Sequence, residues 1–396
     1  GADFRNLSLL EKEYPNLVTL RLPKNYRSTQ TILDAAYGVI ANNKNHPVLK
    51  LEAIKSFGEK IDMVEVMDEK EEAAYVVSVA ERLAAAGGSL AVLYRTNAQS
   101  RAIEEALIRR KIDYKLVGGI RFYDRAEIKD LLAYLRVIYN ADDLVSWQRI
   151  EGLGKRNRVK FEVWLTTERG RLLEKYPHEL LQEVIDQTSY LSRFNERDEE
   201  DMARVENIRE LLAVASEQPS LTAFLESVAL IQSEEIAERK AGKVGVTMMT
   251  IHAAKGLEFD EVIIVGLEEG LLPHSRSLLE REDLEEERRL MYVAMTRARA
   301  KLHLTLTRSR LVYGGRQAAS PSRFLSEIPQ ELLLRIASRG FAAYRELTPK
   351  TITSEDLGDG RRIVSDWETE GVMVGRPDQK VIERETKNDF DEIDTW

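Results

Sequence analysis

The stretch from Val246 to Gly270 constrains the fold most, because two short apolar runs flank a polar turn. Val246–Ile251 enters the turn and Val262–Val265 leaves it. The polar residues of the turn are His252, Lys255, Gly256 and Glu258. Apolar runs of this length, bounded by glycine, are typical of buried strands in a parallel sheet. The turn is therefore predicted to lie at the carboxyl end of a strand, where open α/β sheets bind ligands. A solvated loop between two core strands is the alternative.

The residues before this stretch are predicted to alternate between strands and helices. The expected strands are Leu17–Leu22, Ile61–Val66, Leu90–Tyr94 and Tyr114–Val117. The expected helices are Gln30–Ala41, Glu71–Ala85 and one that ends near Arg110. This alternation predicts a parallel sheet with helical crossovers.

From Asp124 to about Lys243 the apolar spacing of three and four predicts helices alone. The expected helices are Arg125–Tyr139, Lys160–Glu174, His178–Gln187, Glu199–Ala215 and Ser220–Ile231. After the sheet resumes at Val246, we expect a helix over Glu285–Arg299, a strand over Leu302–Leu306 and a short helix near Gln330–Ser338. A helical block inside an α/β order predicts an inserted subdomain.

The distribution of charge matters more than its sum. The formal net charge is −9, and the segment from Ser354 to Trp396 carries 13 acidic and 6 basic residues, which is −7, so the preceding 353 residues carry only −2. A basic strip such as Lys155–Lys160 could therefore meet phosphate. The acidic segment is interpreted as a flexible tail, with a short folded module or partner-binding peptide as the alternative.

Composition narrows the class of protein further. The chain has no cysteine, which excludes disulfides and thiolate metal sites, and its five histidines are scattered, so we expect no metal site. No run approaches the roughly 18 apolar residues that span a bilayer. We therefore expect a cytoplasmic protein without a membrane segment.

Two arginines attract attention for nucleotide chemistry, although each could equally be a surface or ion-pair residue. Arg27 precedes a predicted helix, and Arg297 lies near the resumed sheet. A guanidinium matches phosphate oxygens and keeps its charge, so a pair can stabilise the charge that develops in phosphoryl transfer. No G-x-x-x-x-G-K-[ST] phosphate loop occurs in the chain. Nucleotide hydrolysis would therefore need a second half.

Two further side chains remain open between alternatives. Tyr26 could stack on a nucleobase or pack in the core. Glu258 could accept hydrogen bonds from a ribose hydroxyl or cap the following turn.

Five ordered motifs over about 300 residues resemble those of the UvrD/PcrA/Rep family of superfamily-one DNA helicases. They are N-Y-R-S-T at Asn25–Thr29, L-Y-R-T-N-A-Q-S-R at Leu93–Arg101, G-G-I-R-F-Y-D-R-A-E-I-K-D at Gly118–Asp130, T-I-H-A-A-K-G-L-E-F at Thr250–Phe259 and E-E-R-R-L-M-Y-V-A-M-T-R-A-R at Glu286–Arg299. The first motif departs from the family pattern, with Lys24 where glutamine is usual. Gly1-Ala2-Asp3 also resembles the residues after the family's third motif, so we expect a carboxyl-terminal half that begins where a first RecA-like domain ends.

The resemblance implies roles for individual residues at an ATP site. Tyr26 would stack on adenine, Glu258 would contact the ribose, and Arg27 and Arg297 would reach the γ-phosphate as the catalytic arginines. ATP with Mg²⁺ is the implied cofactor, and the Mg²⁺ ligands are expected on the missing amino-terminal half.

The resemblance also implies a DNA surface. Thr250, His252 and Lys255 would link the nucleotide cleft to single-stranded DNA, and Asn97, Gln99 and Arg101 would lie near that strand. The helical insertion would touch duplex DNA through a family Gly-x-Gly turn and its basic flank. The turn contains Gly152 and Gly154, and its basic flank contains Lys155 and Arg156.

We therefore predict an α/β, RecA-like parallel sheet with helical crossovers, interrupted by an all-helical inserted subdomain. The expected ranges are 1–140 and 244–340 for the RecA-like domain, 141–243 for the insertion and 341–396 for the acidic tail. The insertion is shorter than the family pattern predicts.

The expected function is that of the carboxyl-terminal half of an ATP-dependent 3′–5′ DNA helicase or translocase, inactive alone. The expected partners are single-stranded and duplex-junction DNA, the missing amino-terminal RecA-like half, and a possible protein partner for the tail. The main alternative is a non-catalytic DNA-binding or regulatory module that docks on another helicase or repair partner. A nuclease-associated helicase subunit is a weaker one, since no Asp/Glu/Lys nuclease motif is recognisable.

Overall fold

The computed structural model describes residues 13–14, 18, 20–44, 49–195, 197–238, 245–312, 315–337, 362–365 and 372–375. The chain divides into two compact units, Gly1–Arg345 and Glu346–Trp396. Most of the segment interpreted as a flexible tail lies outside the described residues. Its described part is an antiparallel pair, β12 (Arg362–Ser365) and β13 (Val372–Gly375).

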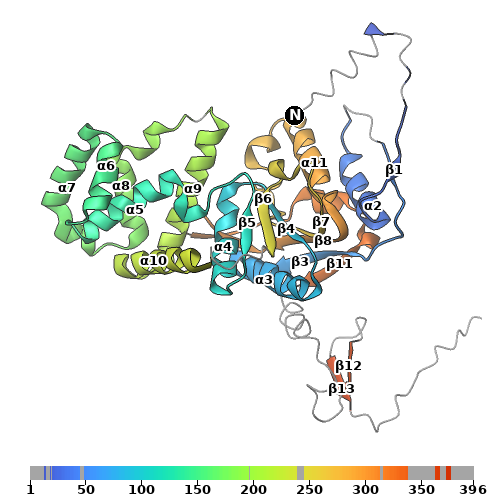
Figure 1. Cartoon of the computed structure of the whole chain (residues 1–396). Helices are drawn as coiled ribbons and strands as arrows, with labels where there is room; N and C mark the ends of the chain where they lie inside the picture. Colours follow the sequence, from blue (N-terminus) through green and yellow to red (C-terminus); the bar gives the residue numbers. More distant parts are fainter. Residues whose placement is uncertain are drawn as a thin grey trace, which may run out of the picture. The chain divides into compact units, whose positions relative to one another are not determined.

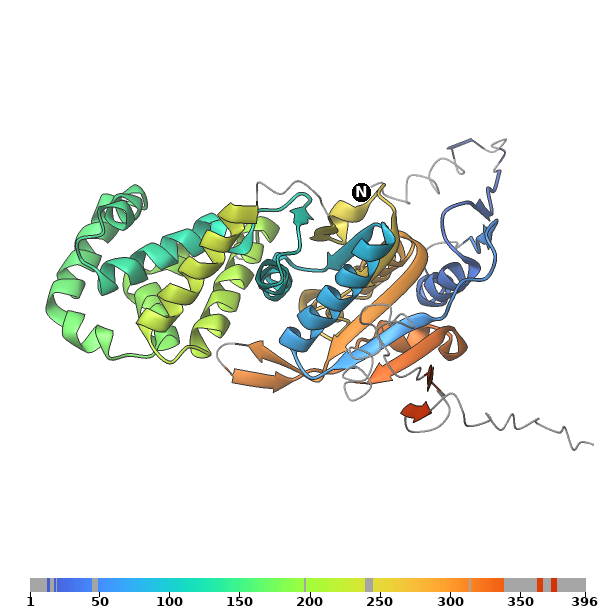
Figure 2. The ribbon, with the colours of Figure 1, turned by 60° about the horizontal axis from the view of Figure 1, so that its bottom comes forward.

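The first unit is built on a seven-stranded sheet in the order β11-β3-β8-β7-β4-β6-β5, in which every neighbouring pair is parallel (Figures 1 and 2). The strands are β3 (Ile61–Val66), β4 (Leu90–Tyr94), β5 (Tyr114–Leu116), β6 (Val246–Thr250), β7 (Phe259–Ile264), β8 (Ala298–Thr307) and β11 (Leu333–Ala337). All five residues of β4 are buried, as expected for a central strand covered on both faces.

Helices cover both faces of the sheet, and alternate residues of the central strand β4 belong to two separate apolar clusters. Val92 of β4 packs in the cluster that contains α3 (Glu69–Ala86) and α4 (Ser100–Arg109). Leu93 packs in the other, with α2 (Gln30–Ile40) and α11 (Arg281–Met295). The result is a three-layer α/β arrangement, and the predicted RecA-like fold class is confirmed.

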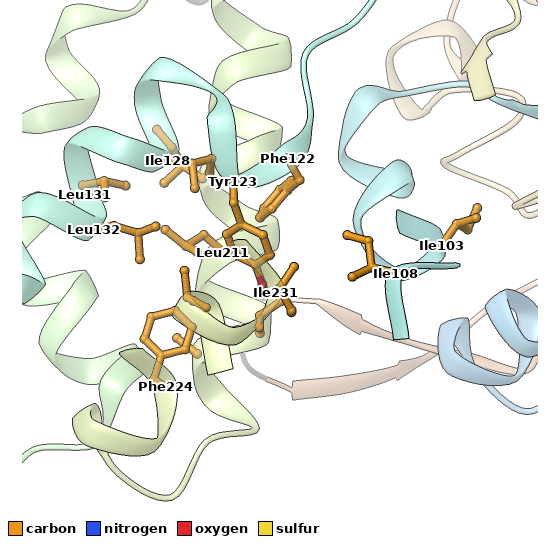
Figure 3. Packing of buried hydrophobic residues seen from close by; sticks show 14 of the residues in the cluster. Ile103, Ile108, Phe122, Tyr123, Ile128, Leu131, Leu132, Leu211, Phe224 and Ile231 are labelled. Carbon is orange, nitrogen blue, oxygen red and sulfur yellow. The ribbon is translucent and has the colours of Figure 1, made fainter. Parts of the chain in front are cut away.

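The chain leaves the sheet after β5 and returns at β6, and every described element between them is helical. A 3₁₀ turn η2 (Phe122–Asp124) precedes the helices α5 (Ala126–Tyr139), α6 (Leu144–Gly152), α7 (Lys155–Leu173), α8 (Pro177–Thr188), α9 (Glu199–Ser216) and α10 (Leu221–Glu238), with one further 3₁₀ turn η3 (Tyr190–Arg193). Buried side chains from η2, α5, α9 and α10 pack in one cluster that continues into α4 (Figure 3). The predicted helical insertion is therefore present, and its exact boundaries stay a prediction.

Several local predictions are wrong. The described residues of the expected strand Leu17–Leu22 form no strand, and Val18, Leu20 and Leu22 are exposed because no neighbouring strand covers them. The expected helix near Gln330–Ser338 is instead a 3₁₀ turn η6 (Gln330–Leu332) followed by β11, which pairs with β3 at the sheet edge.

Other errors concern the helices. Helix α11 ends at Met295 rather than Arg299, because Ala298 already pairs with Phe259 of β7. Helix α6 was not predicted, and its last residue is Gly152, which was assigned to a turn. Two short strand pairs were also not predicted: β1 (Lys24–Asn25) with β2 (Glu52–Ala53), and β9 (Ser309–Val312) with β10 (Gly315–Ala318).

None of the described helices has both the length and the apolar character needed to cross a membrane.

Candidate functional site

The polar turn after β6 lies where the sequence predicts it, at the carboxyl end of a central strand. A 3₁₀ turn η4 (His252–Ala254) follows β6 almost directly, and the Ile251 amide donates to Tyr94 O at 2.9 Å, which ties the turn to β4. Gly256 adopts a φ of +88°, which side chains rarely allow. The exposed residues Lys255 and Glu258 flank this glycine.

Glu258 lies between two arginines that are far apart in the sequence. Arg27 Nε donates to Glu258 Oε2 at 2.7 Å, and Arg299 Nη1 donates to Glu258 Oε1 at 3.4 Å. Arg299 also donates to Asp260 Oδ1 at 2.8 Å. The hydrogen bond from Arg27, followed by the charges of both arginines, lowers the pKa of Glu258 below its usual value. Glu258 therefore offers an ionised acceptor at the surface.

Arg297 lies beside this cluster without a carboxylate partner among the described residues. Its guanidinium donates to Val293 O at 2.9 Å, to Leu257 O at 3.2 Å and to Thr296 Oγ1 at 3.1 Å. Arg27 Nη1 donates to Thr296 O at 3.4 Å, so the two arginines meet at one residue. Burial, and then the charge of Arg27, lowers the pKa of Arg297. An incoming anion would relieve this repulsion.

A cavity of about 500 Å³ opens beside Arg27, Glu258 and Arg299. Its lining includes Lys24, Tyr26, Arg27, Lys55, Glu258 and Arg299. Tyr26 is 72% exposed, which excludes the alternative that its ring packs in the core. Four cations, one carboxylate and an exposed ring suit a ligand that carries both an anionic chain and a planar base. A nucleotide fits this residue set.

A second cavity, of about 550 Å³, brings together three residues that the sequence predicts to face DNA. Asn97, Thr250 and His252 line it, together with Arg95 and His274. Its acidic lining residues are Glu199, Glu206, Asp283, Glu286 and Glu287, from α9 and α11. Lys255 does not line this cavity and stays exposed in the turn.

One carboxylate organises the floor of this second cavity. Glu287, which is 2% exposed, accepts from Arg95 Nε at 3.0 Å and Nη2 at 2.9 Å, and from the His274 amide at 3.0 Å. Partial desolvation of the His252 ring, and then the charge of Arg95, lowers the pKa of that histidine. His252 is therefore expected to be neutral at pH 7.

Gln99 and Arg101 are engaged within the protein. Gln99 Oε1 accepts from the Arg95 and Thr96 amides at 3.0 and 2.9 Å. Arg101 is 4% exposed and donates to Glu210 at 2.6 Å and to Glu105 at 3.0 Å. Neither side chain lines the second cavity, and their role near DNA stays a prediction.

The predicted Gly-x-Gly segment lies at the junction between α6 and α7. Gly154 adopts a φ of +131°, and nothing in the structure lies within 4 Å of a Cβ placed there. Lys155 and Arg156 are exposed at the start of α7. These residues line neither cavity, so their contact with duplex DNA stays a prediction.

Sequence reasoning assigned no role to several residues of the two cavities. Arg95 directly follows β4, so its place at the carboxyl end of a strand was a usable signal. Arg299 lies within a recognised motif, two residues after Arg297. Lys55 and His274 carry no sequence signal, because loops fold them into place. No group of three or more His, Asp or Glu side chains that could hold a metal ion occurs in the described part of the chain.

The parallel sheet and its helical insertion define a RecA-like domain. Comparison with known proteins shows the family to which the chain belongs. The model of the UvrD-like helicase C-terminal domain matches residues 20–169 and 157–309. The chain therefore belongs to the UvrD-like helicase C-terminal domain family.

Two relatives illustrate the similarity. The ATP-dependent DNA helicase PcrA of Bacillus subtilis is 39% identical over 388 residues, which cover 84% of this chain and 52% of that protein. PcrA of Staphylococcus aureus is 36% identical over 448 residues, covering 96% of this chain and 61% of that protein. The chain thus spans between half and two thirds of the length of these relatives.

One solved structure, the C-terminal domain of a possible DNA helicase from a Lactobacillus, shares 14% identity and a TM-score of 0.35 with this chain. The alignment covers 78% of this chain and 98% of the solved one, and no argument is based on a TM-score this low.

Proposed function

We propose that this chain is the carboxyl-terminal half of an ATP-dependent 3′–5′ DNA helicase or translocase. In this proposal it supplies two arginines to an ATP site that is completed by an amino-terminal RecA-like half. It also supplies part of a single-stranded DNA surface. Both relatives are ATP-dependent DNA helicases, which supports the reaction class, and the resemblance of the motifs supports the polarity.

The convergence of Arg27 and Arg297 carries the proposal. These residues lie at opposite ends of the first unit's sequence, yet both donate to Thr296. Tyr26 exposes its ring beside them, and Glu258 is held ionised next to Arg27. A purely structural ion pair would need neither the exposed ring nor a second guanidinium, that of Arg297, which has no carboxylate partner among the described residues.

The residues of the proposed ATP site have distinct tasks, and one of them, Arg297, lies beside the first cavity without lining it. The Tyr26 ring stacks on adenine, and the Glu258 carboxylate accepts hydrogen bonds from ribose hydroxyls. Arg27 and Arg297 donate to the γ-phosphate and stabilise the charge that develops as its bond to the leaving oxygen lengthens. Mg²⁺ would neutralise phosphate charge when bound. Its ligands are proposed to lie on the amino-terminal half.

Helix α11 runs from the second cavity to Arg297. Glu287 in its middle anchors Arg95 and His274 in the second cavity, and Arg297 follows its last residue by two positions. We propose that single-stranded DNA contacts Asn97, Thr250 and His252. Closure of the nucleotide cleft would then move α11 as a rigid element and alter the grip on DNA.

Reconstitution with a separately produced amino-terminal half tests the proposal. The chain alone is expected to show negligible ATP hydrolysis, and mixing the halves should restore DNA-stimulated turnover. Arg297→Ala should then lower kcat by about 10³-fold, because an arginine that stabilises the transition state contributes that much. Single-stranded DNA binding, measured by fluorescence anisotropy, should change less than about twofold.

Arg281→Ala is the matched control, because Arg281 is an exposed arginine at the other end of the same helix, paired with Glu285. It should leave turnover unchanged. Robust steady-state hydrolysis by the isolated chain would contradict the proposal. Full turnover in a well-folded Arg297→Ala assembly would contradict the role of that arginine.

A further inference from the structure

Strand β2 and the loop after it lie outside the family motifs, and hydrogen bonds hold them against the segment that lines the first cavity. The Glu52 amide donates to Pro23 O and the Ile54 amide donates to Asn25 O, both at 2.8 Å. The Gln30 side chain accepts from the Ala53 amide at 2.7 Å. These bonds fix the backbone of the three residues immediately before Lys55.

Lys55 uses only part of its hydrogen-bonding capacity in this position. Its ammonium donates to Arg27 O at 2.7 Å and lines the first cavity. An ammonium has three donors, so two remain for a ligand. Among the described residues, no carboxylate pairs with Lys55. The side chain is exposed, yet its hydrogen bond directs it towards the residue proposed to bind the γ-phosphate.

The charge of the cavity favours an anion at this position. Lys24, Arg27, Lys55 and Arg299 contribute four positive charges to its lining, and Glu258 contributes one negative charge. Lys55 offers donors and no acceptor, which suits phosphate oxygens better than a base edge or a ribose hydroxyl. The ring of Tyr26 and the carboxylate of Glu258 already match those other two parts of a nucleotide.

We propose that Lys55 is a nucleotide-binding residue, whose ammonium contacts the phosphate chain of the nucleoside triphosphate. Its hydrogen bond to Arg27 O would at the same time hold the backbone of the catalytic arginine in place. This inference rests on the proposed function, because it assigns the first cavity to a nucleotide.

Calorimetric titration of the full 396-residue chain at low ionic strength, without Mg²⁺, tests the proposal. The ligands are ATP, inorganic tripolyphosphate and adenosine. Lys55→Gln should weaken ATP and tripolyphosphate binding by about five- to tenfold, the usual effect of losing one charged hydrogen bond. Adenosine binding should change less than about twofold. Lys55→Arg should keep phosphate binding within about twofold of the wild type.

Lys60→Gln is the matched control, because Lys60 is an exposed lysine five positions further along that does not line the cavity. It should alter none of the three affinities. An equal loss of adenosine and ATP binding in Lys55→Gln would show a purely structural role and overturn the inference. Unchanged ATP and tripolyphosphate binding, or no tripolyphosphate binding by the wild type, would also overturn it.

A further variant separates this inference from the proposed function. If Tyr26→Ala weakens ATP binding and Lys55→Gln does not, the nucleotide site stands and the role of Lys55 falls. If Lys55→Gln weakens tripolyphosphate binding but Tyr26→Ala leaves ATP binding unchanged, an anion site stands and its assignment to a nucleotide falls.

Discussion

At the scale of single residues, the least exposed histidine of the fold lies between two carboxylates. His303 of β8 is 0% exposed, with Nδ1 3.2 Å from Asp62 and Nε2 3.1 Å from Glu261. Burial acts to raise the pKa of Glu261, but the hydrogen bonds from His303 and Arg82 outweigh it and lower this pKa to about 2. Contacts of His303 with Asp62 and Glu261 thereby link the strands β3, β7 and β8.

Stability at acid pH should depend on Glu261. Its pKa is lower in the folded state than its ordinary value of 4.5, so its contribution is complete above about pH 4.5 and is lost as the pH falls towards 2. We expect Glu261→Gln to lower the free energy of unfolding by about 2–3 kcal/mol at pH 7. The difference from the wild type should nearly vanish at pH 2, as measured by urea unfolding.

Glu59→Gln serves as the control for this experiment. Glu59 also pairs with a basic side chain near β8, at 3.2 Å from Lys301, but its own side chain is 81% exposed. Its loss should cost less than about 0.5 kcal/mol. A cost of Glu261→Gln that is the same at every pH would contradict the ionised pair.

At the scale of elements, the turn after β7 packs closely against the segment that follows β4. Gly266 adopts a φ of +72°, and a Cβ there would lie 2.1 Å from Gln99 Nε2. Gln99 cannot easily withdraw, because its Oε1 accepts from two backbone amides of the segment that follows β4. The turn and the Asn97 segment are therefore packed too closely for any side chain at position 266.

Gly266→Ala and Gly87→Ala form a matched pair for testing this packing. Gly87 ends α3 with the same φ of +72°, but nothing lies within 4 Å of a Cβ there. Gly87→Ala should cost about 1 kcal/mol of unfolding free energy, from backbone strain alone. Gly266→Ala should cost about 3 kcal/mol, because the clash adds to that strain. Equal costs in denaturant unfolding would show that Gln99 moves freely.

At the scale of the whole molecule, charge and folded core are divided unequally between the two compact units. Residues 346–396 include 14 acidic and 7 basic residues, which gives a net charge of −7 out of the total of −9. The sheet, both cavities and the large apolar clusters belong to the first unit. Removing the second unit should therefore change electrostatics more than stability.

Deletion of residues 346–396 should strengthen single-stranded DNA binding at about 50 mM salt by about two- to fivefold, because less negative charge opposes the phosphates. The gain should shrink at about 0.3 M salt. Calorimetry should show the melting temperature of the first unit shifted by less than about 2 °C. A salt-independent change in affinity, or a large fall in melting temperature, would contradict this division of roles.

The sequence determined the alternation of strands and helices, the helical insertion and the polar turn after β6. Those features follow from the local pattern of apolar residues, in which a short apolar run such as Leu90–Tyr94 indicates a buried strand. The resemblance of its motifs to the UvrD/PcrA/Rep family implied one ATP site for Arg27 and Glu258, whose side chains lie 2.7 Å apart in the structure.

Only the tertiary structure decided the features that depend on distant partners. Residues 333–337 form a strand because the edge of β3 offers them hydrogen bonds, although their own pattern favours a helix. Lys55 reaches the first cavity because β2 pairs with β1, and Arg101 turns inward because Glu210 of α9 lies beside it. Local pattern fixes which residues can form an element, whereas contacts between remote segments fix which side chains face a ligand.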